Sequence, residues 1–539
     1  MRGKLAIIGI DGGTFKILNP LVKMDIIPNI RYMVYNGYSA ILKSTIPPTT
    51  VPAWYSLATG LNPGKLGFTS FFVYETPNEK RLVTSSDIKN KAIWDFISSY
   101  GLKCAVINFP TYPPIPVNGY FVTGMLTPSN ENFTYPPEFQ NIIRKYVGDY
   151  LVDVDHYEYA NPKKILKICI KSIEQKSKLF DLLLKEDYID FLFLIFTETD
   201  RIQHLIWNKM EISKEEIKFS ESKLEELFFD FWGKLDIIAG KILKKFDNVI
   251  IVSDHGFTAL RGEFYINEWL LKNECLKCRV KPKETKHFIS LEEIKRALIK
   301  LGIFDYTVQI LKMMIGKERL KKLQNKILPK EEIELSEIIN YKASKAFALE
   351  GEPETCQIVI NPNLNPIHKE KIKKEIIEKI TRELNVRGLM TRVYTKEEVY
   401  KCLENLKRII PDIVIYIHGW HIKPYIRSRR ISATRHCSYF SSHLDPRNTG
   451  THDKDGIFIA FGRDIKRGYS KKYFQIVDIA PTVLFMMNIP IPPSMDGKVL
   501  KEIFKEDSEY YTKKIVYRQD YQKRQLREVI HRLKREGKI

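Results

Sequence analysis

The chain alternates short hydrophobic runs with long segments in which hydrophobic residues recur every three or four positions. Short apolar runs bounded by Gly, Pro, Asp or His are typical of buried strands. They occur at Leu5–Ile10, Cys104–Asn108, Phe191–Phe196, Val249–Val252, Ile413–Ile417 and Ile457–Phe461. Helical periodicity predicts long helices over Lys163–Leu184 and Lys218–Lys245. Strands that alternate with such helices indicate an α/β protein, here a three-layer α/β/α sandwich around a mainly parallel central sheet.

Two segments depart from this alternation and are predicted to be insertions. Residues 271–345 are Lys-rich and helical in period, which favours a helical cap, and residues 346–410 have the pattern of a small α+β unit. The central sheet is expected to resume at Asp412. The predicted organisation is a first part of the core (1–270), the cap (271–345), the small insertion (346–410), a second part of the core (411–507) and a basic C-terminal helix (508–539).

Composition adds a cellular setting to this picture. A chain of 539 residues with 44% hydrophobic residues can bury a large core. Seven scattered cysteines argue against a disulfide framework, and the pair Cys275 and Cys278 alone is a weak metal signal. The first apolar run is brief and ends at Asp11, so it predicts a strand rather than a signal peptide. No apolar run has the length of a spanning helix, and we expect a cytoplasmic protein.

The charge balance is strongly basic, with 86 Lys and Arg against 65 Asp and Glu and a formal net charge of +21. Such a charge attracts polyanions, which include phosphorylated substrates, nucleic acid and anionic membrane surfaces. It does not distinguish among them, and a Lys-rich surface that is simply solvated has the same composition. The sequence carries no signal for an oligomeric state.

Side chains able to bind metals or act as nucleophiles gather where the predicted strands end. In a parallel sheet these ends share one edge, where ligands bind. The positions are Asp11, Thr50, Asp200, His204, Asp254, His255 and His452. Taken singly, such residues are common as helix caps or in loops. Together, three aspartates, three histidines and one hydroxyl form a donor set for two divalent cations with mixed shells.

These residues also carry a family resemblance. The chain resembles the alkaline-phosphatase superfamily, type I phosphodiesterase/nucleotide pyrophosphatase branch, and the resemblance implies an alkaline-phosphatase-like fold. Its motifs, in order, are Asp11-Gly-Gly, Thr50-x-Pro with Ala58-Thr-Gly60-Leu-x-Pro63, Asp200-x-x-x-His204, Ser253-Asp254-His255-Gly256 and Gly450-x-His452. The resemblance implies that Asp200, His204 and His452 hold one metal and that Asp11, Asp254 and His255 hold the other, with Thr50 at the second. The implied metals are two divalent ions, zinc first, with manganese as the alternative.

The same resemblance implies a reaction. The Thr50 hydroxyl, activated by a cation, would attack phosphorus and form a phospho-threonine, which water then hydrolyses. Two successive displacements predict net retention of configuration at phosphorus. The expected enzyme is a phosphodiesterase or nucleotide pyrophosphatase that acts on a phosphorylated small molecule or nucleotide.

The chain departs from the family pattern in the residues around the nucleophile. After Pro63 the family usually has His-Gly and then an Asn that contacts a phosphoryl oxygen, whereas here Thr69 and Ser70 follow. That contact would then come from Thr69, Ser70, the Thr50 amide or a basic cap residue. Trp54 stands where an Asn-His pair is common, either as a packing residue or as a platform for a base.

Two histidines near a later strand form a further cluster. His418 and His421 follow the run Ile413–Ile417. They could line the substrate pocket or supply another ligand, and the alternative is a purely structural role.

Other reactions and another class of function stay open at this point. The same ligands could serve a phosphomonoesterase, a phosphoglycerate-mutase-like enzyme or a phosphotransferase. A sulfatase is disfavoured, because that branch has Cys or Ser-x-Pro-x-Arg where this chain has Thr50-Val-Pro-Ala-Trp54. An inactive, basic protein that binds nucleic acid or a membrane surface is the alternative of another class.

Overall fold

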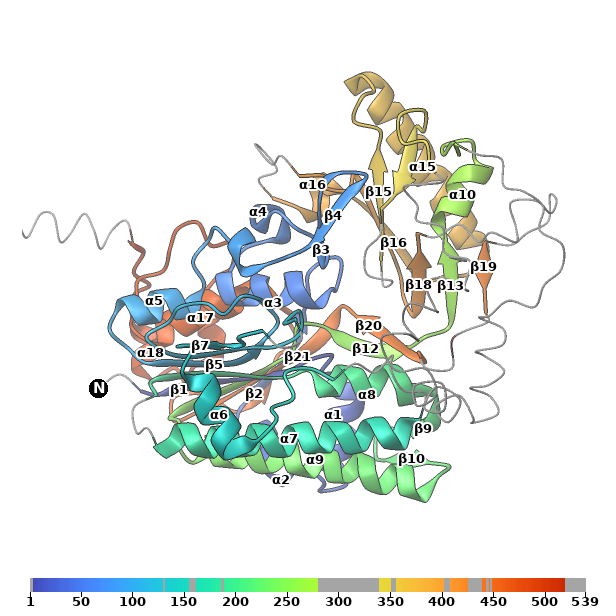
Figure 1. Ribbon diagram of the computed structural model, residues 1–539. Helices are drawn as coiled ribbons and strands as arrows, with labels where there is room; N and C mark the ends of the chain where they lie inside the picture. Colours follow the sequence, from blue (N-terminus) through green and yellow to red (C-terminus); the bar gives the residue numbers. More distant parts are fainter. Residues whose placement is uncertain are drawn as a thin grey trace, which may run out of the picture.

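The structure is a computed structural model (Figure 1). It describes residues 3–128, 131–154, 161–185, 189–279, 339–349, 355–401, 408–424, 439–442, 445 and 448–518. Most of the predicted cap (280–338) and most of the predicted C-terminal helix (519–539) lie outside this part of the chain.

A large central sheet organises the core. Its strands run in the order β22-β2-β21-β11-β1-β8-β5-β6-β7, and β23 also pairs with β2. The bounds are β1 Leu5–Ile10, β2 Tyr38–Lys43, β5 Cys104–Phe109, β6 Gly119–Thr123, β7 Thr134–Tyr135, β8 Phe191–Phe196, β11 Asn248–Val252, β21 Asp455–Gly462, β22 Gly468–Tyr469 and β23 Phe474–Gln475. The middle strands β11, β1, β8, β5 and β6 are parallel, and β21 runs antiparallel to both β11 and β2. The sheet is therefore mainly parallel, as predicted.

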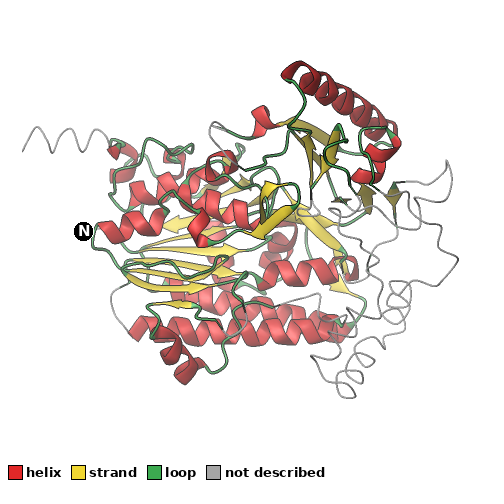
Figure 2. Cartoon of the chain, turned by 45° about the horizontal axis from the view of Figure 1, so that its top comes forward, coloured by secondary structure: helices red, strands yellow, loops and turns green. Residues whose placement is uncertain are grey.

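Helices cover both faces of this sheet (Figure 2). Ala6, Ile8 and Ile10 of β1 pack into one hydrophobic cluster, while Leu5 and Ile7 pack into another on the opposite face. The first cluster includes residues of α1 (Phe15–Lys23), α2 (Pro28–Asn36), α6 (Phe139–Val147), α7 (Pro162–Lys185), α8 (Glu198–Ile206) and α9 (Ser222–Leu243). The second includes residues of α3 (Thr50–Thr59), α5 (Ile93–Ser99) and α17 (Ile479–Met486). The three-layer α/β/α prediction is confirmed.

A second, smaller sheet lies beside the core (Figure 1). It is antiparallel, in the order β14-β15-β17-β16, with bounds β14 Ala346–Ala348, β15 Thr355–Ile360, β16 Thr391–Thr395 and β17 Ile413–Ile417. The helix α15 (Pro366–Val386) packs against it. The sequence pattern predicted that the run Ile413–Ile417 belongs to the central sheet. This prediction is wrong, because the run pairs with β15 and β16 of the second sheet. A buried apolar run has the same appearance in either sheet, because burial does not reveal which strands pair.

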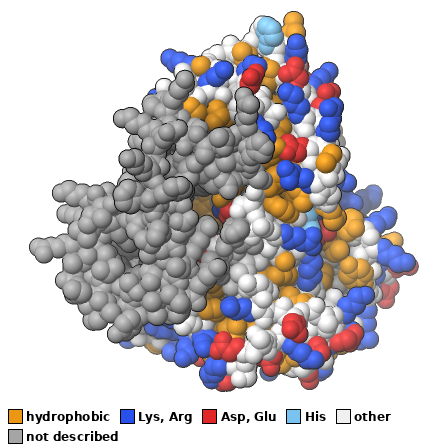
Figure 3. Space-filling model, turned by 90° about the vertical axis from the view of Figure 1, so that its right-hand side faces the viewer, with side chains coloured by type: hydrophobic (Ala, Val, Ile, Leu, Met, Phe, Trp, Pro, Cys, Tyr) orange, Lys and Arg blue, Asp and Glu red, His pale blue; other side chains and the backbone are white. Residues whose placement is uncertain are grey.

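Further short helices and strands lie outside these two sheets and their long helices. They are α4 Pro63–Leu66, β3 Phe72–Thr76, β4 Glu79–Leu82, β9 Met210–Ile212, β10 Ile217–Phe219, β12 Gly256–Ala259, β13 Gly262–Tyr265, α10 Ile266–Lys272, α16 Lys396–Val399, β18 Trp420–Lys423, β19 Phe440–Ser441, β20 Gly450–Asp453 and α18 Glu509–Thr512. Within the described residues, none of the helices combines the length and the apolar character that a membrane crossing requires. On the face shown in Figure 3, Lys and Arg side chains are interspersed with acidic and hydrophobic ones.

A buried ion pair joins two helices on one face of the sheet. Lys176 Nζ of α7 lies 2.7 Å from both carboxylate oxygens of Glu198 on α8, and their side chains are 0% and 2% exposed. We expect Lys176→Met to lower the free energy of unfolding by roughly 3 kcal/mol or more in a urea titration, because it leaves the Glu198 carboxylate buried without its cation.

The control for this prediction is Lys241→Met. Lys241 pairs with Asp181 at the surface, where the two side chains are 33% and 48% exposed. Its loss should cost less than about 1 kcal/mol, because solvent screens exposed charges. Equal losses in the two variants would contradict the prediction.

Candidate metal centre

Neighbouring strands bring the predicted ligands to one edge of the central sheet. Asp11 follows β1, Asp254 and His255 follow β11, and Asp200 and His204 lie on α8, directly after β8. Because β8, β1 and β11 are adjacent and parallel, their carboxyl ends coincide. His452 arrives from β20, which pairs antiparallel with β12, the strand that follows His255. Every one of these side chains is buried, as is that of Thr50.

The first ligand group consists of Asp200, His204 and His452. Asp200 Oδ1 lies 3.3 Å from His204 Nε2 and 3.2 Å from His452 Nε2. The two Nε2 atoms are 3.2 Å apart. Asp200 and His204 are four residues apart on one helix, so they project from the same face. The three donor atoms therefore lie close enough together to bind one ion.

The second ligand group consists of Asp11, Asp254 and His255. His255 Nε2 lies 3.5 Å from Asp11 Oδ1 and 3.1 Å from Asp254 Oδ2. The two groups are neighbours, because the rings of His255 and His452 stack with their centroids 3.6 Å apart. Donor atoms of Asp200, His255 and His452 also lie within 4.8 Å of one another.

Backbone carbonyls orient the three imidazoles. Nδ1 of His204 lies 3.0 Å from the Gly450 oxygen, Nδ1 of His255 lies 3.0 Å from the Gly256 oxygen, and Nδ1 of His452 lies 3.0 Å from the Pro48 oxygen. A carbonyl oxygen only accepts hydrogen bonds, so each Nδ1 carries the proton and donates it. In a neutral ring, Nε2 is then left with a lone pair that faces the interior of the site, and this is the form of imidazole that binds a metal.

The three candidate carboxylates, Asp11, Asp200 and Asp254, each direct one oxygen toward the same interior as the imidazoles. Asp11 Oδ1, Asp200 Oδ1 and Asp254 Oδ2 are buried and, apart from their contacts with the candidate histidines, have no hydrogen-bond partner among the described residues. Burial and the nearby Asp254 raise the pKa of Asp11 well above its usual value, and burial raises the pKa of Asp254 to about 8. Burial opposes ionisation of Asp200 as well, but His204 and His452 hold its pKa well below the usual value. Such buried carboxylates are stabilised by cations, so this donor set fits divalent metal binding.

Thr50 lies within reach of the second group. It is the first residue of α3, and its Oγ1 is 3.3 Å from His255 Nε2. The first N–H groups of a helix have no acceptor within the helix, and they carry a partial positive charge that favours anions. The hydroxyl therefore occupies a place where a phosphoryl group can bind.

Trp54 is a packing residue. Its side chain is buried, packs edge-on against Phe193 at a centroid distance of 5.8 Å and donates from Nε1 to Asp11 Oδ2 at 3.4 Å. The buried ring offers no face on which a substrate base could stack.

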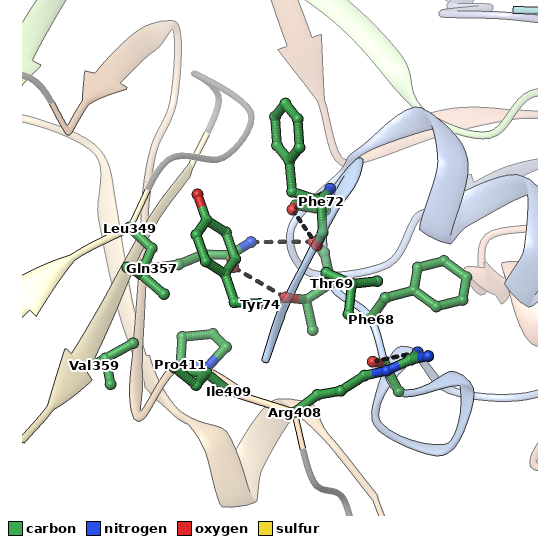
Figure 4. A pocket seen from close by; sticks show the side chains of 13 residues that line it. Phe68, Thr69, Phe72, Tyr74, Leu349, Gln357, Val359, Arg408, Ile409 and Pro411 are labelled. Carbon is green, nitrogen blue, oxygen red and sulfur yellow. Dashed lines mark hydrogen bonds between the residues drawn. The ribbon is translucent and has the colours of Figure 1, made fainter. Parts of the chain in front are cut away.

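Thr69 and Ser70 are engaged in hydrogen bonds within the protein. Thr69 Oγ1 donates to Gln357 Oε1 at 2.9 Å, and Gln357 Nε2 donates to the Thr69 carbonyl at 3.1 Å. Ser70 Oγ donates to the Phe72 carbonyl and accepts from the Phe72 amide. Figure 4 shows Thr69 and Gln357 facing each other in a pocket between the core and the second sheet. None of the metal-ligand candidates lines this pocket.

His418 and His421 stand apart from both ligand groups among the described residues. His418 Nδ1 lies 3.3 Å from the Tyr416 hydroxyl and 3.8 Å from Asp453 Oδ1. His421 is buried on β18, and burial, together with the charge of Lys423, holds its pKa well below the usual value. A neutral, buried imidazole fits the structural alternative for His421.

Sequence reasoning missed one charged neighbour of the centre. Arg201 Nη1 lies 3.6 Å from Asp200 Oδ2, while its Nη2 lies 3.1 Å from Asp153 Oδ2. Its position next to Asp200 in the chain was the available signal. The ion pair between Arg201 and Asp153 joins residues that are far apart in the sequence, so the sequence pattern does not predict it.

Comparisons with known proteins bear on the family. The model of the family "Type I phosphodiesterase / nucleotide pyrophosphatase" matches residues 5–439. Among solved structures, murine ectonucleotide pyrophosphatase/phosphodiesterase 5 has 14% identity and a TM-score of 0.47, covering 93% of this chain and 100% of its own. The human counterpart has 15% identity and a TM-score of 0.48, covering 93% of this chain and 98% of its own. No curated protein matches the chain.

The family match extends over most of the 539 residues and includes every ligand candidate except His452. The chain therefore belongs to the type I phosphodiesterase/nucleotide pyrophosphatase family, and it is a hydrolase of phosphodiester or pyrophosphate bonds.

Proposed function

We propose that the protein hydrolyses phosphorylated nucleotides or related small phosphodiesters through a covalent phosphoryl intermediate on Thr50. The observation that carries this proposal is the position of the Thr50 hydroxyl, at the first turn of α3 and 3.3 Å from His255 Nε2 of the second ligand group. A helix N-terminus binds the phosphoryl oxygens, and the hydroxyl supplies the nucleophile.

Two divalent cations are proposed as cofactors. Asp200, His204 and His452 would hold one, and Asp11, Asp254 and His255 the other. Imidazole and carboxylate ligands together favour zinc, and manganese is the alternative. Cations bound there would lower the pKa of the threonine hydroxyl and offset the negative charge of the transferring phosphoryl group.

The residues of the chain account for both displacements. Thr50 Oγ forms a bond to phosphorus as the bond to the leaving oxygen breaks, and the threonine proton leaves to solvent. Amides at the start of α3 hold the phosphoryl oxygens, because the hydroxyls of Thr69 and Ser70 already have partners. Water then attacks the phospho-threonine, and Thr50 regains a proton. Two inversions give net retention at phosphorus.

The cellular setting is a further proposal. Cys104, Cys169, Cys275 and Cys278 are free thiols, and the first three are buried. Unpaired cysteines are typical of proteins in a reducing compartment, which supports a cytoplasmic location.

Parallel rate measurements test the proposed reaction. With zinc or manganese added, bis(p-nitrophenyl) phosphate should be hydrolysed faster than p-nitrophenyl phosphate, and p-nitrophenyl sulfate should be inert. A faster monoester reaction would assign the protein to the monoesterase alternative. Absence of turnover on all three esters and on a dinucleotide, despite bound metal, would support the inactive binding protein.

A further inference from the structure

The three ligand carboxylates share a feature that the proposed reaction does not use. In each, one oxygen faces the candidate histidines of the site and has no other hydrogen-bond partner among the described residues, and these inner oxygens are Asp11 Oδ1, Asp200 Oδ1 and Asp254 Oδ2. The other oxygen accepts a hydrogen bond in Asp11 and Asp254, and in Asp200 it forms an ion pair with Arg201. A carboxylate held in this way can offer only one oxygen to a cation, and its direction is set before the cation binds.

The donors that hold the outer oxygens come from different parts of the chain. The Gly12 amide donates to Asp254 Oδ1 at 3.2 Å. The Trp54 indole donates to Asp11 Oδ2 at 3.4 Å, and the Arg201 guanidinium faces Asp200 Oδ2 at 3.6 Å. The first is a backbone group, whereas Trp54 and Arg201 are side chains that mutation can remove.

Both side chains are themselves held in place. Trp54 lies one helical turn after Thr50 on α3, so the two residues project from the same face of the helix. Its ring approaches β1 so closely that a Cβ at Gly9 would lie 2.6 Å from it. Arg201 is 13% exposed and anchored on its far side by Asp153. Their positions are therefore determined by packing and by charge.

We propose that Trp54 and Arg201 are positioning residues of the metal centre, each directing one ligand carboxylate toward a different cation. Trp54 acts on Asp11 and thus on the cation of Asp254 and His255. Arg201 acts on Asp200 and thus on the cation of His204 and His452. This inference rests on the proposed two-metal centre and adds residues that the family motifs do not include.

Cobalt binding to the full-length, metal-free protein tests the inference without an activity assay. We expect wild type to bind two equivalents of Co²⁺ in competition with a chromophoric chelator. Trp54→Phe keeps a ring but removes the N–H, and it should keep one tight equivalent while the other weakens by about tenfold or more. Arg201→Gln should likewise weaken one equivalent by about tenfold or more, but this equivalent is the cation of Asp200, His204 and His452. Arg201→Lys should recover part of that affinity because it keeps the positive charge.

Trp94→Phe is the matched control. Trp94 is also a buried tryptophan of the same hydrophobic cluster, but its Nε1 has no hydrogen-bond partner in the part of the chain that the structure describes. We expect both equivalents to bind this variant as tightly as they bind wild type. Thermal unfolding of the metal-free variants shows whether each is folded, and the Arg201 variants test the inference on their own if Trp54→Phe is not.

The double variant Trp54→Phe/Arg201→Gln decides whether the two residues serve different cations. Weakening of both equivalents supports the proposal, and retention of one tight equivalent overturns it. Unchanged Co²⁺ affinity in both single variants also overturns it while leaving the proposed function intact. If wild type binds no Co²⁺, the proposed metal centre fails, and this inference fails with it.

Discussion

Replacement of Thr50 with alanine should lower turnover of a phosphodiester by roughly 10⁴-fold or more, because loss of the attacking group removes the covalent route. Metal content should stay close to that of wild type, since the six Asp and His ligands remain. Steady-state rates on bis(p-nitrophenyl) phosphate and metal analysis of the purified variant measure the two quantities. Thr50→Ser, which keeps a hydroxyl, should retain part of the activity.

Thr49→Ala is the control for this prediction. Thr49 is the neighbouring buried threonine, and none of the described residues forms a hydrogen bond with its hydroxyl. Its loss should leave turnover within a few-fold of wild type. Acid quenching during turnover, followed by mass spectrometry, should find a phosphate on Thr50 in the wild-type protein. Full activity of Thr50→Ala would exclude the proposed nucleophile.

Removal of divalent cations should abolish activity and destabilise the fold. Three buried acidic side chains would then face one another with only partial compensation of their charge, which Arg201 provides beside Asp200. A cation that binds only the folded state at a hundred to a thousand times its Kd adds about 3–4 kcal/mol. Urea unfolding of the dialysed protein, with and without added zinc, measures this difference, and zinc should restore the rate.

Asp254→Asn provides the comparison for the metal experiment. The amide keeps the size of the side chain but removes one negative charge from the cluster. The metal-free variant should therefore be at least as stable as metal-free wild type, and zinc should stabilise it less. Equal stabilisation of the two proteins by zinc would show that the cation binds elsewhere.

The fold was predictable from the sequence where burial alone decides the structure. The runs Leu5–Ile10 and Phe191–Phe196 are strands with the predicted bounds, because strands in the middle of a parallel sheet are apolar on both faces. The run Ile413–Ile417 is equally apolar but belongs to the second sheet. Hydrophobicity predicts that a strand is buried but does not predict which strands pair with it. For Ile413–Ile417 the pairing strands are β15 and β16, which lie in the insertion.

The candidate site divides in a similar way. Asp11, Asp200, His204, Asp254 and His255 come together because the carboxyl ends of the adjacent parallel strands β8, β1 and β11 meet. His452 reaches them from the β12–β20 ribbon, and Thr50 reaches them from the start of α3. The contacts of Thr69 with Gln357 and of Trp54 with Asp11 could not be predicted, since they are hydrogen bonds between residues far apart in the sequence. Such hydrogen bonds depend on where each side chain points in the folded protein, and the order of residues in the sequence does not give that direction.

The ribbon formed by β12 and β20 has a consequence for how this enzyme can diversify. Ala259 and Gly450 face each other across the ribbon, so the long stretch of chain between them leaves the core and returns at neighbouring points. A segment with adjacent ends can be lengthened, shortened or exchanged without moving the ends themselves. Selection could therefore remodel this excursion to suit new substrates while His255 and His452 keep their separation.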